Sequence, residues 1–268
     1  MIKISIITIC YNAEDVIEKT MRSILSQTYE SIEYILVDGD SIDRTNMIIE
    51  HMRYAFEEKG IVFKHISEKD DGISDAFNKG IKLSTGEIVG IINAGDQLAN
   101  NSLNLVSDSF TESFDILYGN VLWDDRANNL TYIRKSKRDW KSCVYDMSAL
   151  HPAIFIKKRA YNRIGYYRKD YKICMDKELL VKMYYCGLKF KFVDNVLAVM
   201  DAGGVSDNAE RNAIYISESI MIALDNGIPK HRIVMFLKYQ NVRNSFKRWL
   251  KKNTSFYKNY VNRQFICF

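Results

Sequence analysis

Short runs of β-branched residues alternate with longer stretches of helical periodicity through the N-terminal part of the chain, and this alternation restricts the fold more than any other feature. We expect buried strands at 3–10, 33–37, 61–66 and 87–92. Between them, the segments 13–28 and 44–59 repeat their apolar residues at the spacing of an amphipathic helix. Strands that alternate with helices of this length predict an α/β fold with a parallel sheet wound by helical crossovers.

The second half of the chain is less regular. Further strands are expected at 115–121, 131–134, 153–156 and 190–200, with a helix at 175–186 and helix-rich sequence after Ser206. Pro229, one of only two prolines, ends an Asn-Gly-Ile-Pro stretch that is typical of a boundary. The sequence therefore predicts a main domain at 1–225, with halves at 1–98 and 99–205, and a tail at 226–268.

The tail differs from the rest of the chain in charge. It holds ten Lys and Arg residues and no Asp or Glu, whereas the preceding residues hold 28 basic and 33 acidic side chains. Apolar residues recur every three or four positions, at Met235, Tyr239, Val242, Phe246 and Trp249. Basic residues fill the positions between and after them, at Lys238, Arg243, Lys247, Arg248, Lys251 and Lys252. This pattern is typical of a helix that lies on an anionic membrane surface. The alternative is a helix that packs its apolar stripe on the main domain.

Cysteine usage and hydropathy indicate the compartment. The five cysteines, Cys10, Cys143, Cys174, Cys186 and Cys267, are odd in number and form no C-x-x-C pair, so we expect reduced thiols. The chain opens with a run too short and too alternating for a signal peptide, and no uncharged apolar run is long enough to span a bilayer. We expect a cytoplasmic protein without a transmembrane segment.

Polar side chains follow each of the four expected N-terminal strands. Tyr11 and Asn12 come after the first strand, and the acidic segments 38–43, 68–72 and 93–96 come after the other three. Ligands of open α/β sheets bind outside the carboxyl ends of the strands, so these segments are the candidate site. Two structural alternatives stay open: Asp38 could cap a helix and hold a turn, and 93–96 could be a plain turn.

Taken in order, these segments resemble the family 2 glycosyltransferases, which have the GT-A fold. The opening strand at 5–12, the Ser-Gln-Thr-Tyr stretch at 26–29 and the 37–45 segment are similar to the family's first motifs. The 70–80 segment is similar to its D-x-G-x-x-D-A-x-N-x-G motif, and 151–155 and 176–180 fit its acceptor half. The resemblance covers most of the chain up to Ser206, and it is nearest to the transferases of colanic-acid, capsule and O-antigen assembly.

The resemblance implies a GT-A fold with a Rossmann-like, mostly parallel central sheet flanked by helices and a helical basic C-terminal extension. Residues 1–98 would then be the nucleotide-sugar-binding half and 99–205 the acceptor half. The implied nucleotide-binding residues are Thr8, Tyr11, Asp38, Asp70, Asp75 and Asn78. Asp38 would accept a hydrogen bond from the base, and UDP is the expected nucleotide.

The same resemblance places a divalent cation, Mg²⁺ or Mn²⁺, at Asp96. This residue matches the last carboxylate of the family's D-x-D type motif, whereas Asn93 and Gly95 stand where carboxylates are more usual. One carboxylate and the donor diphosphate can still hold Mg²⁺, because this ion commonly takes one or two protein carboxylates and several waters.

Asp176 falls at the position of the family's catalytic base. The chemistry needs such a base, because an acceptor hydroxyl must lose its proton as it attacks the anomeric carbon. Glu178 lies two residues later and cannot share a helix face with Asp176, so only one of them is expected to point into the cleft. His151, held extended by Pro152, is predicted to contact a sugar. The glycines of 202–206 could approach a phosphate or form a turn over the cleft.

Other classes of protein fit less well. A Rossmann oxidoreductase is disfavoured because the turn after the first strand lacks G-x-G-x-x-G, and the acidic main domain argues against a nucleic-acid partner. A catalytically silent nucleotide-sugar-binding or scaffold subunit is the main alternative, motivated by Asn93 and Gly95. The expected partners are a nucleotide-sugar donor, a glycan or polyprenyl-linked acceptor and the inner leaflet of a bacterial membrane. Self-association as a homo-oligomer stays open.

Overall fold

A computed structural model describes residues 1–125, 130–145, 147–201, 209–236, 238, 239, 242 and 245. The strands are β1 (Ile4–Cys10), β2 (Ile32–Asp38), β3 (Val62–Ser67), β4 (Ile88–Ile91), β5 (Gln97–Leu98), β6 (Ile116–Asp125), β7 (Leu130–Arg134), β8 (Ile154–Lys157) and β9 (Phe190–Asp201). The helices are α1 (Ile17–Leu25), α2 (Thr45–Glu58), α3 (Ile73–Leu83), α4 (Ser102–Ser109), α5 (Lys158–Ile164), α6 (Met175–Tyr185) and α7 (Ala209–Asp225).

The strands form one mixed sheet in the order β3-β2-β1-β4-β8-β6-β9-β5, with β7 paired to β6. Strands β1 to β4 are mutually parallel, as the alternating pattern predicts. Strand β8 is antiparallel to both β4 and β6, and β9 is parallel to β6. Strands β1, β2, β3, β4, β6 and β9 therefore run in the same direction and end at the same edge of the sheet. The predicted α/β GT-A fold is confirmed.

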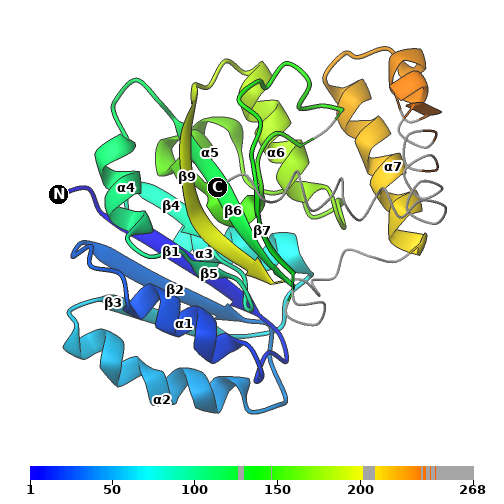
Figure 1. Ribbon diagram of the computed structural model, residues 1–268. Helices are drawn as coiled ribbons and strands as arrows, with labels where there is room; N and C mark the ends of the chain where they lie inside the picture. Colours follow the sequence, from blue (N-terminus) through cyan, green and yellow to red (C-terminus); the bar gives the residue numbers. More distant parts are fainter. Residues whose placement is uncertain are drawn as a thin grey trace.

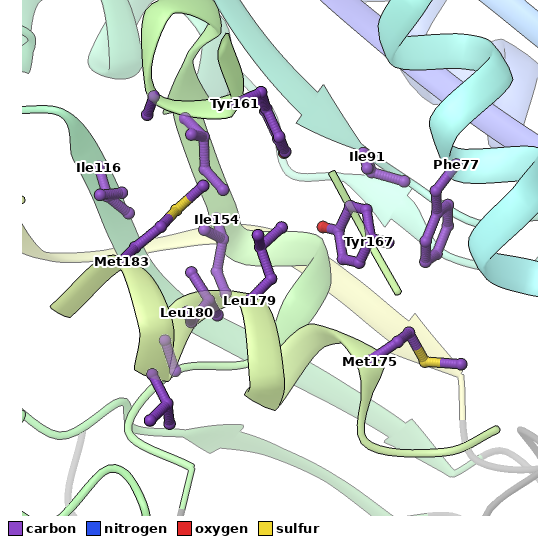
Figure 2. Packing of buried hydrophobic residues seen from close by; sticks show 14 of the residues in the cluster. Phe77, Ile91, Ile116, Ile154, Tyr161, Tyr167, Met175, Leu179, Leu180 and Met183 are labelled. Carbon is purple, nitrogen blue, oxygen red and sulfur yellow. The ribbon is translucent and has the colours of Figure 1, made fainter. Parts of the chain in front are cut away.

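Helices cover both faces of the sheet (Figure 1). Each face has its own apolar core. Strand residues alternate between the two cores, as the side-chain period of a strand requires. In β1, Ile4 and Ile6 pack with apolar residues of α1, α2 and α4, whereas Ile7 packs with those of α3, α5 and α6. Figure 2 shows the second core, with Tyr167 lying between Phe77 of α3 and the apolar residues of α6. The sheet is thus enclosed, and the ends of its strands are the place left for a ligand.

Helix α7 and the residues after it also pack on the main domain. Ile222 and Ala223 of α7 are fully buried in the same core as α6, and Ile233, beyond the turn at 226–229, is 3% exposed. The ring of Phe236 lies 5.1 Å from that of Tyr145. The packed body therefore extends past the predicted boundary at residue 225, and a separate unit at 226–268 remains a proposal only for the residues after Phe236.

Two expectations about elements are wrong. Strand β3 was expected to be buried, but it is an edge strand with a half-exposed pattern, and Val62 is 47% exposed. Helix α1 spans only Ile17–Leu25 and is therefore shorter than the expected helix at 13–28. Hydrophobic periodicity also gave no indication of β5, α4 or α5, which are short and partly polar.

Candidate functional site

The sheet topology brings most of the predicted site residues to one edge. Tyr11, Asp38 and the turn 93–96 follow or end the parallel strands β1, β2 and β4. His151 begins a short 3-10 helix, His151–Ala153, that leads into β8, so it is not extended as its position before Pro152 predicts. Because β8 runs in the opposite direction, His151 lies at the same edge. Asp201 ends β9 there as well. Residues that are far apart in the sequence thus share one rim of the molecule.

The loops after β1 and β2 are fastened to each other. The backbone N–H of Asn12 donates to Ser41 Oγ at 2.8 Å, and Asn12 Oδ1 accepts the N–H of Ile42 at 3.0 Å. Asn12 and Asp40 have positive φ angles of 47° and 68°, which are uncommon for residues other than glycine. These bonds hold the strained conformations in place and shape the rim.

Tyr11, Gly39 and Asp70 lie together at this rim. A Cβ atom on Gly39 would come within 3.1 Å of Asp70 Oδ2 and 3.5 Å of the Tyr11 ring, so glycine keeps this spot open. Tyr11 is 62% exposed, which leaves its ring available for stacking on a flat ligand. The three residues form the part of the site best suited to a nucleoside.

Asp38 has a structural role that its motif position does not indicate. It is fully buried, and its carboxylate accepts hydrogen bonds from the backbone N–H and hydroxyl of Ser41, from Asn46 Nδ2 at 2.9 Å and from Ser67 Oγ at 2.6 Å. Burial alone would raise the pKa of Asp38, but these hydrogen bonds outweigh it and hold the pKa below its ordinary value. In the structure, Asp38 thus holds the turn after β2, which is one of the two alternatives left open by the sequence. To accept a hydrogen bond from a base as well, Asp38 would have to lose one of its bonds to Ser41, Asn46 or Ser67.

Thr8 and Asn78 are also committed within the protein. Thr8 is fully buried, and its hydroxyl accepts a hydrogen bond from Tyr34 at 3.1 Å in the core on the α2 side of the sheet. Asn78 uses both ends of its amide on the backbone of Tyr167: Nδ2 donates to the carbonyl at 2.8 Å and Oδ1 accepts the N–H at 3.0 Å. Both side chains thus have partners inside the protein, and their contact with a nucleotide stays a prediction.

Asp70 and Asp75 belong to a group of ion pairs with two lysines. Lys79 Nζ lies 2.6 Å from Asp70 Oδ1 and 3.6 Å from Asp75 Oδ2, and Lys169 Nζ lies 2.5 Å from Asp75 Oδ1. Burial raises the pKa of Asp70, and the adjacent Lys79 opposes this shift. The two predicted acidic residues are thus accompanied by two cations that sequence reasoning did not indicate.

The turn after β4 is fixed by helix α1. Gly95 adopts φ of +100°, its N–H donates to Thr20 Oγ1 at 3.0 Å, and that hydroxyl donates to the carbonyl of Asp96 at 2.7 Å. Asp96 is 8% exposed. Burial raises its pKa to about 7, with the charge of Asp201 adding to the shift and that of Lys19 opposing it. Asn93 Oδ1 is buried and has no hydrogen-bond partner among the described residues.

Asp176 lies in the first turn of α6, close to His151 and Tyr167. Burial lowers the pKa of His151 and raises that of Tyr167, and in both cases the nearby Asp176 carboxylate favours the protonated form. His151 Nε2 lies 3.3 Å from the Tyr167 hydroxyl, and its ring stacks on Phe77 at 5.0 Å. A carboxylate of α6, an imidazole from the segment before β8 and a phenol from the loop between α5 and α6 are thus assembled, with Phe77 of α3 packed against the imidazole.

Glu178 faces a different environment, as the spacing of two residues along the helix predicts. It is buried, and burial raises its pKa, while Lys182 and Arg168 oppose the shift. Asp225 at the end of α7 adds to it. The structure therefore does not bring Glu178 together with Asp176 and His151, and we leave it out of the proposed sugar site.

Glu218 of α7 supports the start of α6. Its carboxylate accepts three backbone N–H groups, from Lys172 at 2.7 Å, Ile173 at 3.1 Å and Cys174 at 2.7 Å. These groups directly precede Asp176 in the chain. Glu218 therefore fixes the backbone from which Asp176 projects.

Sequence reasoning missed Lys19, Lys79, Lys169, Asp201 and Glu218. Asp201 could have been found by the rule that located the others, since it ends a strand. Lys79 could have been found as well, because it lies four residues after Asp75 on the same helix. Lys19, Lys169 and Glu218 have partners far away in the sequence, and no local pattern marks them.

Several sequence-based expectations fall elsewhere. Segment 202–206, Phe246, Trp249, Cys267 and most basic residues of the tail lie outside the described residues. Within the described part, Cys10, Cys143, Cys174 and Cys186 are free thiols. In that part there is also no helix with the length and apolar character needed to cross a bilayer. No three His, Cys, Asp or Glu side chains there converge as metal ligands.

Comparison with known sequences places this site in context. The family model described as glycosyl transferase family 2 matches residues 5–184. The PGL/p-HBAD biosynthesis glycosyltransferase of Mycobacterium tuberculosis is 27% identical over 183 residues, which cover 67% of this chain and 69% of that protein. Glycosyltransferase GlyG of Streptococcus pneumoniae is 23% identical over 268 residues and matches 88% of this chain and 86% of its own length.

Solved structures share the fold at low identity. S. aureus TarS superposes with a TM-score of 0.64 at 16% identity over 88% of this chain, which spans only 42% of the TarS chain. TarS 1–349 in complex with UDP-GlcNAc gives 0.64 at 18% identity, with 88% and 71% of the two chains covered. The mannosyltransferase PcManGT of Pyrobaculum calidifontis, in complex with GDP-Man and Mn²⁺, gives 0.62 at 19% identity, with 89% and 69% covered.

Proposed function

The chain belongs to glycosyl transferase family 2, and from this premise we propose that it moves a sugar from a UDP-sugar to a glycan or lipid-linked acceptor with inversion at the anomeric carbon. The observation that carries the proposal is the position of Asp176. It lies beside His151, at the edge of the sheet where β1, β2 and β4 also present the nucleoside-side residues and Asp96. A base and a donor site then lie at the same edge of the sheet.

The reaction is a single displacement. The acceptor hydroxyl gives its proton to the Asp176 carboxylate while its oxygen bonds to the anomeric carbon. The bond from that carbon to the diphosphate breaks, and the diphosphate leaves with the electron pair. Attack from the side opposite the leaving group inverts the configuration. We assign His151, which adjoins Asp176, to the acceptor sugar, and Tyr167, which is 5% exposed, to holding the His151 ring.

The donor is held on the other side of the rim. We assign the Tyr11 ring to the base, the open spot at Gly39 to the ribose, and Asp70 and Asp75 to the nucleotide side of the cleft. Lys79 and Lys169 are the cations nearest to these carboxylates and can balance the charge of a diphosphate. Two fold relatives are described with UDP-GlcNAc and with GDP-Man, which supports a nucleoside-diphosphate donor of this kind.

Asp96 and Asn93 are the residues that would hold a divalent cation. The unpartnered Asn93 Oδ1 and the buried Asp96 carboxylate are hard oxygen donors, the type that Mg²⁺ and Mn²⁺ prefer. PcManGT, one of the fold relatives, is described with Mn²⁺. When bound, such an ion supplies positive charge to the departing diphosphate.

We place the reaction in bacterial surface polysaccharide synthesis, such as that of capsule or O-antigen, at the cytoplasmic face of the membrane. Met235, Tyr239 and Val242, the described part of the predicted apolar stripe, are 66%, 62% and 70% exposed. They do not pack on the main domain, which supports a membrane-facing role over the alternative of packing. An inner-leaflet location would bring the enzyme to a lipid-linked acceptor.

The decisive experiment compares Asp176→Asn with Glu178→Gln. Hydrolysis and transfer from a panel of UDP- and GDP-sugars would be followed, with donor binding measured by thermal shift. Loss of the base should lower kcat by about a hundredfold or more with donor binding kept, whereas Glu178→Gln should have a much smaller effect. Near-normal turnover of Asp176→Asn would refute the assignment. Donor binding without any turnover by the wild type would favour the silent scaffold subunit instead.

A further inference from the structure

Asp201, at the end of β9, lies beside Asp96 although the two are far apart in the sequence. Strands β5 and β9 are antiparallel with Gln97 opposite Val199, which brings the residue before β5 next to the end of β9. Asp201 lies close enough to the Asp96 carboxylate for its charge and its backbone N–H to influence the pKa of Asp96. The register of the sheet therefore adds a second carboxylate to the turn at 93–96.

Two oxygen atoms at this place have no partner among the described residues. They are Asn93 Oδ1 and Asp201 Oδ1, and both are buried. Asn93 belongs to the same turn as Asp96, and its carbonyl accepts the backbone N–H of Asp96 at 3.0 Å. Buried polar atoms are nearly always hydrogen-bonded in folded proteins, so one orphaned acceptor on each side of Asp96 points to a bound cation or donor. The other Asp201 oxygen, Oδ2, forms an ion pair with the ammonium group of Lys19, which lies on α1.

Lys19 is in a position to move. Its side chain is 26% exposed, and a flexible four-carbon stem carries its charge. By contrast, the turn that it faces is fixed to α1 through Thr20. The ammonium group supplies one positive charge to two adjacent carboxylates, and it leaves both orphaned oxygens unsatisfied.

We propose that Asp201 is a third oxygen ligand, with Asp96 and Asn93, for the divalent cation of the donor site, and that Lys19 competes with that cation for Asp201. The inference rests on the proposed function only for the role of the cation. Two carboxylates and one carboxamide match the oxygen preference of Mg²⁺ and Mn²⁺. Once Lys19 has left Asp201, the Lys19 ammonium group becomes free to pair with a diphosphate oxygen.

The test is a titration of the full-length protein with Mn²⁺, with and without UDP. Electron paramagnetic resonance measures the Mn²⁺ that stays free. Lys19→Met should tighten binding and Asp201→Asn should weaken it, each by about tenfold, because ligand charge sets the affinity of such sites. Arg22→Gln removes a charge from an exposed position of the same helix and should leave the affinity unchanged. In the double variant, Lys19→Met should lose its effect, since its competitor role requires Asp201.

Asn93→Asp serves as a control for misfolding. It should bind Mn²⁺ more tightly than the wild type, and a variant that failed to fold could not do so. Equal Mn²⁺ affinity of Asp201→Asn and the wild type would overturn the proposal, as would weaker binding by Lys19→Met. Absence of Mn²⁺ binding by the wild type, even with UDP, would overturn it too. The readout is independent of turnover: the expected binding pattern in a protein that transfers no sugar would uphold this inference and refute the proposed function.

Discussion

Glu33, the second residue of β2, is fully buried and yet ionised at neutral pH. Its carboxylate accepts hydrogen bonds from Ser5 Oγ at 2.5 Å, from the N–H and hydroxyl of Thr85 at 2.7 and 2.9 Å, and from Lys64 Nζ at 2.7 Å. Burial alone would raise the pKa of Glu33, but these partners lower it to about 2. The residue ties β1, β2, β3 and the start of β4 together at the end of the sheet away from the site.

This pKa makes a pH-dependent prediction about stability. A group whose pKa is lower in the folded protein stabilises it above its unfolded value, near 4.5, and this contribution is lost as the pH falls toward 2. Glu33→Gln should cost on the order of 2 kcal/mol of unfolding free energy at pH 7. The difference from the wild type should shrink steadily below pH 4.5.

Denaturant unfolding at pH 7, 4.5 and 3 measures the effect. The exposed Glu58, at the end of α2, is the matched control, and Glu58→Gln should be nearly neutral at each pH. A Glu33→Gln deficit that stays constant down to pH 3 would contradict the prediction.

Single residues also show how far motif reading reaches. Tyr11, Asp96 and Asp176 lie at the shared edge or beside it, where the order of the motifs predicts them. Thr8 and Asn78, taken from the same motifs, satisfy partners inside the protein. A motif records which residue types a family keeps at a position. It does not distinguish residues that contact a ligand from residues that position the contacting ones.

At the scale of elements, periodicity predicted the strands β1 to β4 and the helices α2 and α6 to within two residues at most ends. These elements bury one face or both, so their apolar spacing is regular. Helix α4 has too few buried residues for such a signal. Pairing of β5 with β9 depends on tertiary packing, and the sequence therefore could not reveal that Asp201 joins the turn at 93–96.

Helix α7 gives a prediction at this scale, because its Glu218 holds the backbone that leads into α6. Glu218→Gln keeps the size of the side chain but replaces one acceptor oxygen by an NH₂ group that faces backbone N–H donors. We expect kcat to fall by about tenfold with little change in donor KM, since positioning of Asp176 is lost while the donor site is untouched. Stability should also fall by about 1–3 kcal/mol.

The matched control is Ser217→Ala, the neighbouring exposed residue, whose hydroxyl bonds only within α7. It should change neither kcat nor stability appreciably. If Glu218→Gln raised donor KM and left kcat intact, Glu218 would be a structural residue without a positioning role. Steady-state kinetics and a thermal melt decide between the two.

At the scale of the whole molecule, the exposed stripe of Met235, Tyr239 and Val242 predicts attachment to membranes. Changing all three to Ser in the full-length chain should reduce co-sedimentation with anionic liposomes several-fold, because apolar burial and charge attraction both contribute to such binding. Raising the salt should release the wild type, since the attraction of the basic residues is screened.

The control is a pair of exposed apolar residues elsewhere, Met47 and Tyr54 of α2, which are 62% and 67% exposed. Changing both to Ser should leave liposome binding as it is. If the stripe variant pelleted as well as the wild type, or if neutral liposomes bound equally well, the tail would not be the membrane anchor.

The reversed strand β8 affects how the protein is made. Strand β4 pairs with β1 on one side and with β8 on the other, and β8 leaves the ribosome roughly 60 residues after β4, which takes several seconds at ordinary rates of translation. During that interval the apolar edge of β4 is open to pairing with any other extended chain. Misassembly and chaperone binding are therefore expected while only the N-terminal half has been synthesised. This period ends when β8, Ile154–Lys157, leaves the ribosome and pairs with β4.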